Sequence, residues 1–315
     1  MPVNRLTLVI GILLAQIVNL LIYRAAPVDS DVSAEILRTS WNGQMGWRWM
    51  SGAETVPAAL FFILAWIVPE SPRWLASRGR MEEAEKIWTK LGTPAEERIS
   101  GAGATVGIPW KEFLEPSGLK VLGLGIFLAA FQQWCGLNVV FNCAEEIFRA
   151  AGYDVSGMMF NVVITGAVNF VFTIVAIFLV DRRGRRPLML VGAVGLAWVY
   201  LLIGISYRFR LTRGRVLALV LIAIACYAMT LAPITRVVLS EIFPNRIRST
   251  AMSLAVGSLW ISCCGLTLTF KPLNASLGPA KTFWFYGVIC LVGLAIIATC
   301  LRETKGQTLE KISNG

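Results

Sequence analysis

Three amide side chains lie close together in one apolar run of the sequence, namely Gln132, Gln133 and Asn138. An amide donates and accepts hydrogen bonds without carrying a charge, so this group suits an uncharged ligand with many polar groups. Because unpaired amides are costly in a membrane, hydrogen bonding between helices is the alternative. In a continuous helix, Gln132 and Gln133 diverge by about 100°, and Gln133 and Asn138 by about 140°. A break or kink at Gly136 would help the last two converge.

Two further amides extend this candidate set. Asn142 lies one turn beyond Asn138 and on the same helix face. Asn169 lies in the next apolar run. Each is equally well explained by hydrogen bonds between helices.

A charged cluster, Asp181-Arg-Arg-Gly-Arg-Arg-Pro187, separates two uncharged apolar runs, residues 161–180 and 188–206. Such a cluster between two membrane-length segments predicts a tight turn on one face of a bilayer. Because Lys and Arg accumulate on the cytoplasmic side, we expect this face to be cytoplasmic.

Several kinds of chemistry are not supported by the sequence. The chain contains no histidine, which removes His-based acid–base catalysis and His metal sites. Its seven cysteines form no Cys-x-x-Cys pair, so we expect neither a zinc site nor a disulfide framework. No nucleophile–base pair is evident. We therefore predict no metal, no cofactor and no enzyme activity.

Composition indicates an all-α membrane protein. Of 315 residues, 56% are hydrophobic and 15% charged, whereas a soluble domain has about 25% charged residues. A charge-poor run of about 20 residues can span a bilayer. We predict eight transmembrane helices, close to residues 6–23, 52–68, 119–141, 158–180, 188–206, 216–238, 250–270 and 283–301.

The net charge of +10 is better explained by membrane topology than by nucleic-acid binding. With the first run leaving the cytoplasm, Lys and Arg are more numerous on the cytoplasmic side. The arginines at 208, 210, 213 and 215 oppose this bias, because they fall on the external side.

The predicted organisation has four parts. Residues 1–69 hold two spans, 70–118 form a helical cytoplasmic linker, 119–305 form a six-helix bundle, and 306–315 form a cytoplasmic tail. In the linker, Ala84, Ile87, Trp88 and Leu91 fall at helical spacing and predict a short amphipathic helix. A second short helix is expected at residues 110–114.

Five motifs in register resemble the sugar porter family of the major facilitator superfamily. Within that family, the resemblance is strongest to the bacterial sugar/proton symporters. They are Pro69-Glu-Ser-Pro-Arg73, Gln132-Gln-Trp-Cys-Gly-Leu-Asn138, Asp181-Arg-Arg-Gly-Arg-Arg186, Glu241-Ile-Phe-Pro-Asn-Arg-Ile-Arg248, and Glu303-Thr-Lys-Gly306 with Leu309-Glu310.

The resemblance implies a major facilitator fold containing helices five to twelve of the usual twelve. Helices one to four, which carry the proton-coupling acid and its arginine partner in symporters, are not matched. We therefore expect a truncated chain or a misplaced start site, with a separate chain as one source of the missing helices.

The resemblance also implies roles for individual residues. The amides Gln132, Gln133, Asn138, Asn142 and Asn169 would bind the sugar, and Trp260 would stack on its ring. A cytoplasmic network would gate the site, formed by Glu70, Arg73, Asp181, Arg185, Glu241 and Arg248; the alternative is that these charges only mark topology.

Some positions depart from the family pattern. Arg236 replaces a sugar-contacting tryptophan, and a charge at a span's centre costs about 2.5–3.5 kcal/mol on insertion scales. Arg236 would either extend toward the cytoplasmic surface or enter the cavity and change selectivity. Arg5 stands where a sugar-binding glutamine is common. Glu54 is expected to cap the outer end of the second span, with proton carriage as the alternative.

The function implied is transport of a hexose or pentose by alternating access across the plasma membrane, impaired in a truncated chain. In the intact family protein, transport can be coupled to protons. A sugar-sensing receptor-like protein and a non-transporting remnant are the alternatives.

Overall fold

The structure is a computed structural model that describes residues 2–23, 40–92, 116–153, 155–209, 211–244 and 247–301. Every regular element in these ranges is a helix. The chain divides into two compact units. Unit 1 comprises Met1–Ala25 and Trp110–Gly315, and unit 2 comprises Ala26–Pro109.

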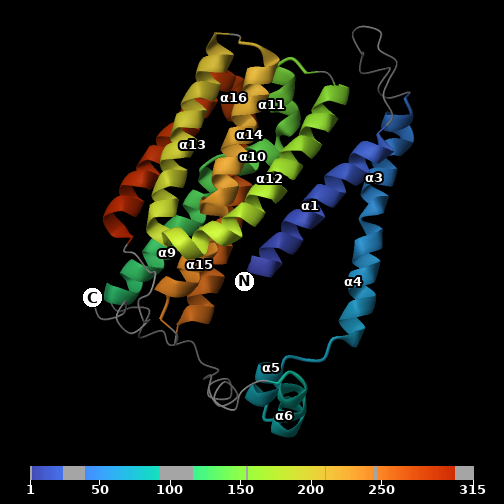
Figure 1. Cartoon of the computed structure of the whole chain (residues 1–315), viewed down its shortest axis with the longest axis vertical. Helices are drawn as coiled ribbons and strands as arrows, with labels where there is room; N and C mark the ends of the chain where they lie inside the picture. The colour runs from blue at the N-terminus through green and yellow to red at the C-terminus, as the bar shows by residue number, and fades with distance from the viewer. Residues whose placement is uncertain are drawn as a thin grey trace. The chain divides into compact units, whose positions relative to one another are not determined.

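Unit 1 is a bundle of long apolar helices (Figure 1). Its helices are α1 (Pro2–Ile22), α9 (Pro116–Trp134), α10 (Leu137–Asn142), α11 (Ala144–Ala150), α12 (Val155–Arg183), α13 (Arg185–Arg208), α14 (Arg213–Met229), α15 (Leu231–Ile242) and α16 (Arg248–Cys300). Helix α1 packs on α12, and α16 packs on both α9 and α13.

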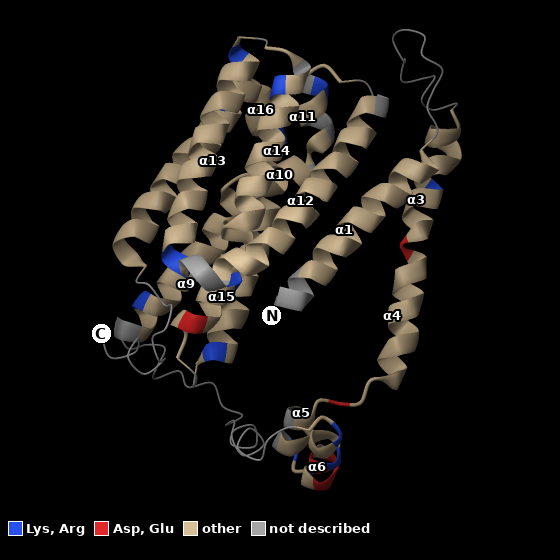
Figure 2. Ribbon diagram, in the orientation of Figure 1, with Lys and Arg blue, Asp and Glu red and all other residues tan. Residues whose placement is uncertain are grey.

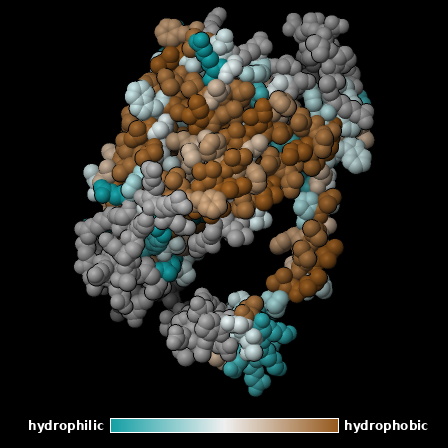
Figure 3. Space-filling view, viewed as in Figure 1, coloured by the Kyte–Doolittle hydropathy of each residue, from teal (hydrophilic) through white to brown (hydrophobic). Residues whose placement is uncertain are grey.

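The bundle has one continuous core, in which Tyr200, Leu196 and Ile203 of α13 are fully buried together with Tyr286 and Cys290 of α16. Its surface is also apolar, and hydrophobic residues cover most of the visible face of the bundle (Figure 3). A helix that is apolar all round suits a membrane, where lipid replaces water at the outer face.

Helix α16 contains two antiparallel segments. Gly278 interrupts its helical backbone with φ of +78° and ψ of +163°. Beyond it, Trp284 Nε1 donates to the Leu201 carbonyl near the end of α13. Ala298 accepts from Arg186 at the start of α13. The second segment therefore runs antiparallel to α13, and the chain reverses at Gly278.

Six helical segments in the described residues are long and apolar enough to cross a membrane. They are Asn42–Ile67, Gly118–Phe141, Gly157–Val180, Arg185–Arg208, Gly214–Ile242 and Arg248–Cys300, and Leu6–Ile22 is apolar but shorter. Arg248–Cys300 holds two of the eight predicted spans, joined at Gly278.

Unit 2 holds a π-helix (Asn42–Gly46), α3 (Trp47–Ala53), α4 (Thr55–Ile67), α5 (Pro72–Ser77) and α6 (Met81–Lys90). Helix α6 confirms the predicted amphipathic helix, since Ala84 and Trp88 are buried against Leu75 and Ala76 of α5. Leu91, predicted on the same face, is exposed because the helix has ended.

Two predictions about unit 2 have different outcomes. Glu54 is exposed between α3 and α4, inside the apolar segment Asn42–Ile67, and makes no side-chain capping hydrogen bond. Glu54 does occupy the N-cap position of α4, but the apolar helical segment begins at Asn42, so Glu54 does not lie at the outer end of the span. The predicted helix at residues 110–114 lies outside the described residues.

Candidate functional site

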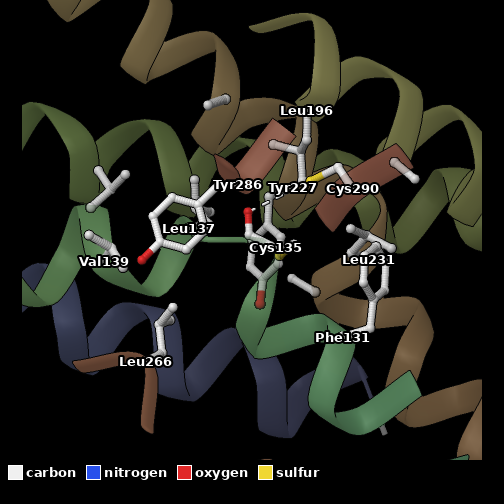
Figure 4. Close-up of a cluster of buried hydrophobic side chains, with 14 of the residues drawn as sticks. Phe131, Cys135, Leu137, Val139, Leu196, Tyr227, Leu231, Leu266, Tyr286 and Cys290 are labelled. Carbon is white, nitrogen blue, oxygen red and sulfur yellow. Dashed lines mark hydrogen bonds between the residues drawn. The ribbon is translucent and has the colours of Figure 1, made fainter. Parts of the chain in front are cut away.

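The site is built on a helix break at Gly136. Helix α9 ends at Trp134, and α10 begins at Leu137. Gly136 adopts the left-handed conformation with φ of +84°. A Cβ atom on Gly136 would lie 2.9 Å from Cγ of Tyr286, so the break requires glycine on two grounds. Figure 4 shows the flanking residues Cys135 and Leu137 beside Tyr286 in the bundle core.

The break joins two of the predicted amides. Asn138 Nδ2 donates a hydrogen bond to Gln133 Oε1. In a continuous helix these side chains would point about 140° apart, so the interruption at Gly136 is what allows them to meet. Gln133 is buried and Asn138 is partly buried. The pair presents two linked amides inside the bundle.

Gln132 points elsewhere, as the 100° divergence predicts. Its Nε2 donates to the carbonyl oxygens of Leu231 and Ala232, at 3.4 and 3.2 Å. These carbonyls lie at the start of α15, directly after the junction with α14 at Thr230. In this conformation, Gln132 therefore forms hydrogen bonds between helices, the alternative to sugar binding, and connects α9 to α15.

The remaining predicted sugar contacts are dispersed. Asn169 is buried on α12, whereas Trp260 is 65% exposed on the first segment of α16. No hydrogen bond among the described side chains joins either one to the Gln133–Asn138 pair. The side chains of Asn142 and Arg5 lie outside the described part of the structure.

The structure adds two amides that were not predicted, the partly buried Gln16 and the buried Asn161. Gln16 of α1 faces Gly166 of α12, where an added Cβ would meet the Gln16 side chain. Gln16 Oε1 and Asn161 Nδ2 of α12 are both buried without a hydrogen-bond partner in the described residues. The signal that singled out Asn169, an amide within an apolar run, would also have found them.

A second group of candidate residues lies where α13 begins and α15 ends. Arg185 Nη2 and Glu241 Oε1 form an ion pair at 3.0 Å, with 19% and 26% of their side chains exposed. Arg248 Nε donates to the carbonyl of Phe243 at 3.2 Å. The side chain of Asp181 lies outside the described residues. The structure thus joins Arg185 to Glu241 across two helices.

Glu70 has a partner that the sequence did not suggest. Arg80 reaches Glu70 at 3.4 Å and Glu83 at 2.6 Å, within unit 2. The hydrogen bond from Arg80 holds the pKa of Glu83 below its usual value. The Arg73 side chain lies outside the described residues. The ion pair of Glu70 therefore joins the segment before α5 to the residue before α6, within unit 2.

Arg236 is exposed on α15, although its helix belongs to an apolar membrane-length segment. It shares its side of α15 with the partly buried residues Pro233, Val237 and Ser240, while Thr235, Val238 and Leu239 face the core. A cation on lipid would be costly. This side of α15 is therefore expected to meet water or polar groups.

Comparison with known proteins gives consistent matches. The family model "Sugar (and other) transporter" matches residues 1–315. The chain is 33% identical over 311 residues to the arabinose-proton symporter of Bacillus subtilis, covering 96% of this chain and 65% of that protein. It is 34% identical over 323 residues to the D-xylose-proton symporter of Escherichia coli, covering 98% and 63%.

A solved structure agrees in shape. The inward-open xylose transporter of E. coli superposes with a TM-score of 0.78 at 31% identity, covering 98% of this chain and 63% of that one. The chain thus spans less than two thirds of the length of these relatives.

Proposed function

Because the chain belongs to the Sugar (and other) transporter family, we propose that it carries a hexose or pentose across a membrane by alternating access. The major facilitator fold and the transporter family are common to its relatives, two of which are named for arabinose and xylose. The observation that carries the proposal is the Gln133–Asn138 pair at the Gly136 break.

The amide pair explains how an uncharged ligand could be held inside the bundle. When the site is empty, the two amides satisfy part of each other's hydrogen-bonding capacity, which lowers the cost of keeping them in an apolar core. A sugar offers hydroxyls that both donate and accept, so it can replace that mutual bond with several new ones. Recognition then requires no change in charge.

The other candidate contacts have supporting roles in this proposal. Gln132 holds α9 against α15 and thereby positions Gln133. Asn142 and Asn169 are further hydrogen-bonding groups, and Trp260 has enough exposed ring surface to stack on a sugar. Arg236, in place of an aromatic side chain, favours ligands that tolerate or prefer a nearby cation.

The charged residues at the α13–α15 end form the proposed gate. The Arg185–Glu241 pair is partly buried, so separating it requires that both charges gain other partners or water. Such a pair can differ between two states of a transporter. Asp181, Arg248, Glu70 and Arg73 complete the proposed network.

We propose eight spans, counting α1, the helices from Asn42 to Ile67, and the two segments of α16 separately. The parts 1–69, 70–118, 119–305 and 306–315 serve as two spans, linker, six-helix bundle and tail. The linker and the C-terminus face the cytoplasm, and the protein lies in the plasma membrane. Coupling to protons requires an acid supplied outside the described bundle, for example by a separate chain.

Uptake of radiolabelled arabinose, xylose and glucose by vesicles containing the full chain tests this function. We expect saturable uptake of at least one sugar, and a rise of about tenfold in KM for Gln133→Ala and for Asn138→Ala, because each removes hydrogen bonds to the ligand. Gln44→Ala is the matched control, since this exposed amide lies outside the site.

Equilibrium dialysis separates the alternatives. Sugar binding without uptake would favour a sensing role. Absence of both binding and uptake for all three sugars would overturn the proposal and favour a non-transporting remnant.

A further inference from the structure

A cavity lies at the end of α13 opposite the Arg185–Glu241 pair. It has a volume of about 1070 Å³ and forms around the reversal of α16 at Gly278. Helix α13 has 24 residues, so its two ends lie about 36 Å apart at 1.5 Å per residue. The cavity therefore opens at the opposite membrane face from the proposed gate.

The cavity is cationic. Arg208 and Lys281 line it and are both exposed, and none of its described lining residues is Asp or Glu. Arg208 is one of the arginines that oppose the charge bias of the chain. Figure 2 shows Lys and Arg at both ends of the bundle, with uncharged helix between them.

Two aromatic side chains that line the cavity hold its walls together by hydrogen bonds to neighbouring helices. Tyr207 donates its hydroxyl hydrogen to the Ile147 carbonyl at 2.8 Å, and Trp284 donates its indole N–H to the Leu201 carbonyl at 3.2 Å. Gly204 allows this close packing, because a Cβ there would meet Nε1 of Trp284 at 2.1 Å. Tryptophan and tyrosine with one polar end are typical of the membrane–water interface.

An apolar groove adjoins the cavity. It has a volume of about 450 Å³, runs between α13 and the second segment of α16, and shares Trp284 with the cationic cavity. Its lining includes Trp198, Val288 and Leu291, which are 61%, 57% and 53% exposed. A cationic pocket thus continues into an apolar channel along the outer surface of the bundle.

We propose that this surface binds an anionic phospholipid. The phosphate lies between Arg208 and Lys281, and one acyl chain lies in the groove beside Trp198 and Leu291. Charge complementarity selects an anionic headgroup, and the adjoining groove selects a lipid over a free anion. Arg208, on the external side, then has a partner in the lipid. This inference is independent of the proposed transport activity.

Native mass spectrometry of the full chain, released from detergent micelles, tests the proposal with phosphatidylglycerol and phosphatidylcholine of identical acyl chains. We expect preferential retention of phosphatidylglycerol. The double variant Arg208→Gln with Lys281→Gln should weaken this retention about tenfold or more. Arg215→Gln is the matched control, because Arg215 is exposed nearby but does not line the cavity.

The groove is tested separately. Leu291→Trp should fill it and reduce retention of phosphatidylglycerol. Leu254→Trp, at a position on the first segment of α16 that is 46% exposed against 53% for Leu291, should not. Equal retention of both lipids by the unaltered chain would overturn the proposal. So would displacement of phosphatidylglycerol by inorganic phosphate alone, because that result would show an anion site without a lipid site.

Discussion

The two compact units of this chain both contain apolar helices of membrane length, yet they bury them very differently. In the bundle of unit 1, between 28% and 61% of an apolar 18-residue stretch in each long span is buried inside the protein. In the Asn42–Ile67 segment of unit 2 the value is 0%. The core of unit 2 lies instead in α5 and α6, where it consists of Leu75, Ala76, Ala84 and Trp88.

This contrast distinguishes two properties that composition alone does not: the suitability of a helix for lipid and its burial inside the protein. An apolar run of about 20 residues indicates that a helix is suited to lipid, but its burial depends on which helices pack against it. In the bundle, glycines such as Gly204 and Gly293 allow aromatic side chains to interlock between helices. In unit 2, order comes from one small amphipathic pair of helices.

The largest effect is expected from Gly136→Val. The substitution forces a β-branched residue into the left-handed conformation and against Tyr286. Strain and overpacking together should lower the free energy of unfolding of the bundle by about 4 kcal/mol. Thermal unfolding in detergent measures this loss. Gly257→Ala is the control, since nothing lies within 4 Å of its added Cβ. An unchanged melting temperature would contradict the role given to the break.

Trp88→Ala should remove most of the unit 2 core. Loss of a buried tryptophan costs about 3 kcal/mol or more, and the α5–α6 pair has few other buried side chains to offset it. Hydrogen exchange should become fast in α6 while α9 to α16 keep their protection. Loss of protection in the bundle as well would show that the two units do not fold independently. Trp74→Ala, at an exposed position, is the control.

Glu241→Gln should have an intermediate effect. Arg185 would keep a hydrogen-bonding neighbour but lose the opposing charge in a partly buried place. We expect a loss of about 1–2 kcal/mol in stability of the bundle, measured by urea or thermal unfolding. Glu85→Gln in α6, an exposed carboxylate, should leave stability unchanged. Equal effects of both substitutions would remove the distinction between the gate and the solvated surface of unit 2.

The smallest effect is a pH dependence confined to unit 2. The hydrogen bond from Arg80 lowers the pKa of Glu83 in the folded state. Its contribution is therefore present above the ordinary pKa of glutamate and is lost as the pH falls through the lower, folded pKa. The protection of α6 amides, measured relative to their intrinsic exchange rate at each pH, should fall below about pH 4.5, and Glu83→Gln should abolish that dependence. An identical acid response in the variant would exclude this pair as its cause.

The sequence predicts much of the fold because hydropathy and helical spacing are local properties. The run at residues 188–206 becomes α13, and the spacing of Ala84 and Trp88 becomes the buried face of α6. The direction of Gln132 away from Gln133 follows from the helical period alone.

What the sequence does not specify is which neighbour a side chain meets. The carbonyl partners of Gln132 lie about 100 residues away in the chain, and Arg80 as the partner of Glu70 depends on the turn between α5 and α6. Pro69 to Arg73 match a family motif without indicating that pairing. The reversal between the predicted spans at 250–270 and 283–301 was expected, but its position was not, because a single glycine with positive φ, Gly278, is enough to produce it.

That reversal bears on how the protein is made. The two segments of α16 are joined by Leu277, Gly278 and Pro279, with no long polar loop between them. If the first segment entered the bilayer alone, no water-soluble linker would connect it to a second segment that was still outside the membrane. The final two spans are therefore expected to enter the membrane together as one helical hairpin, already paired when the bundle assembles around them.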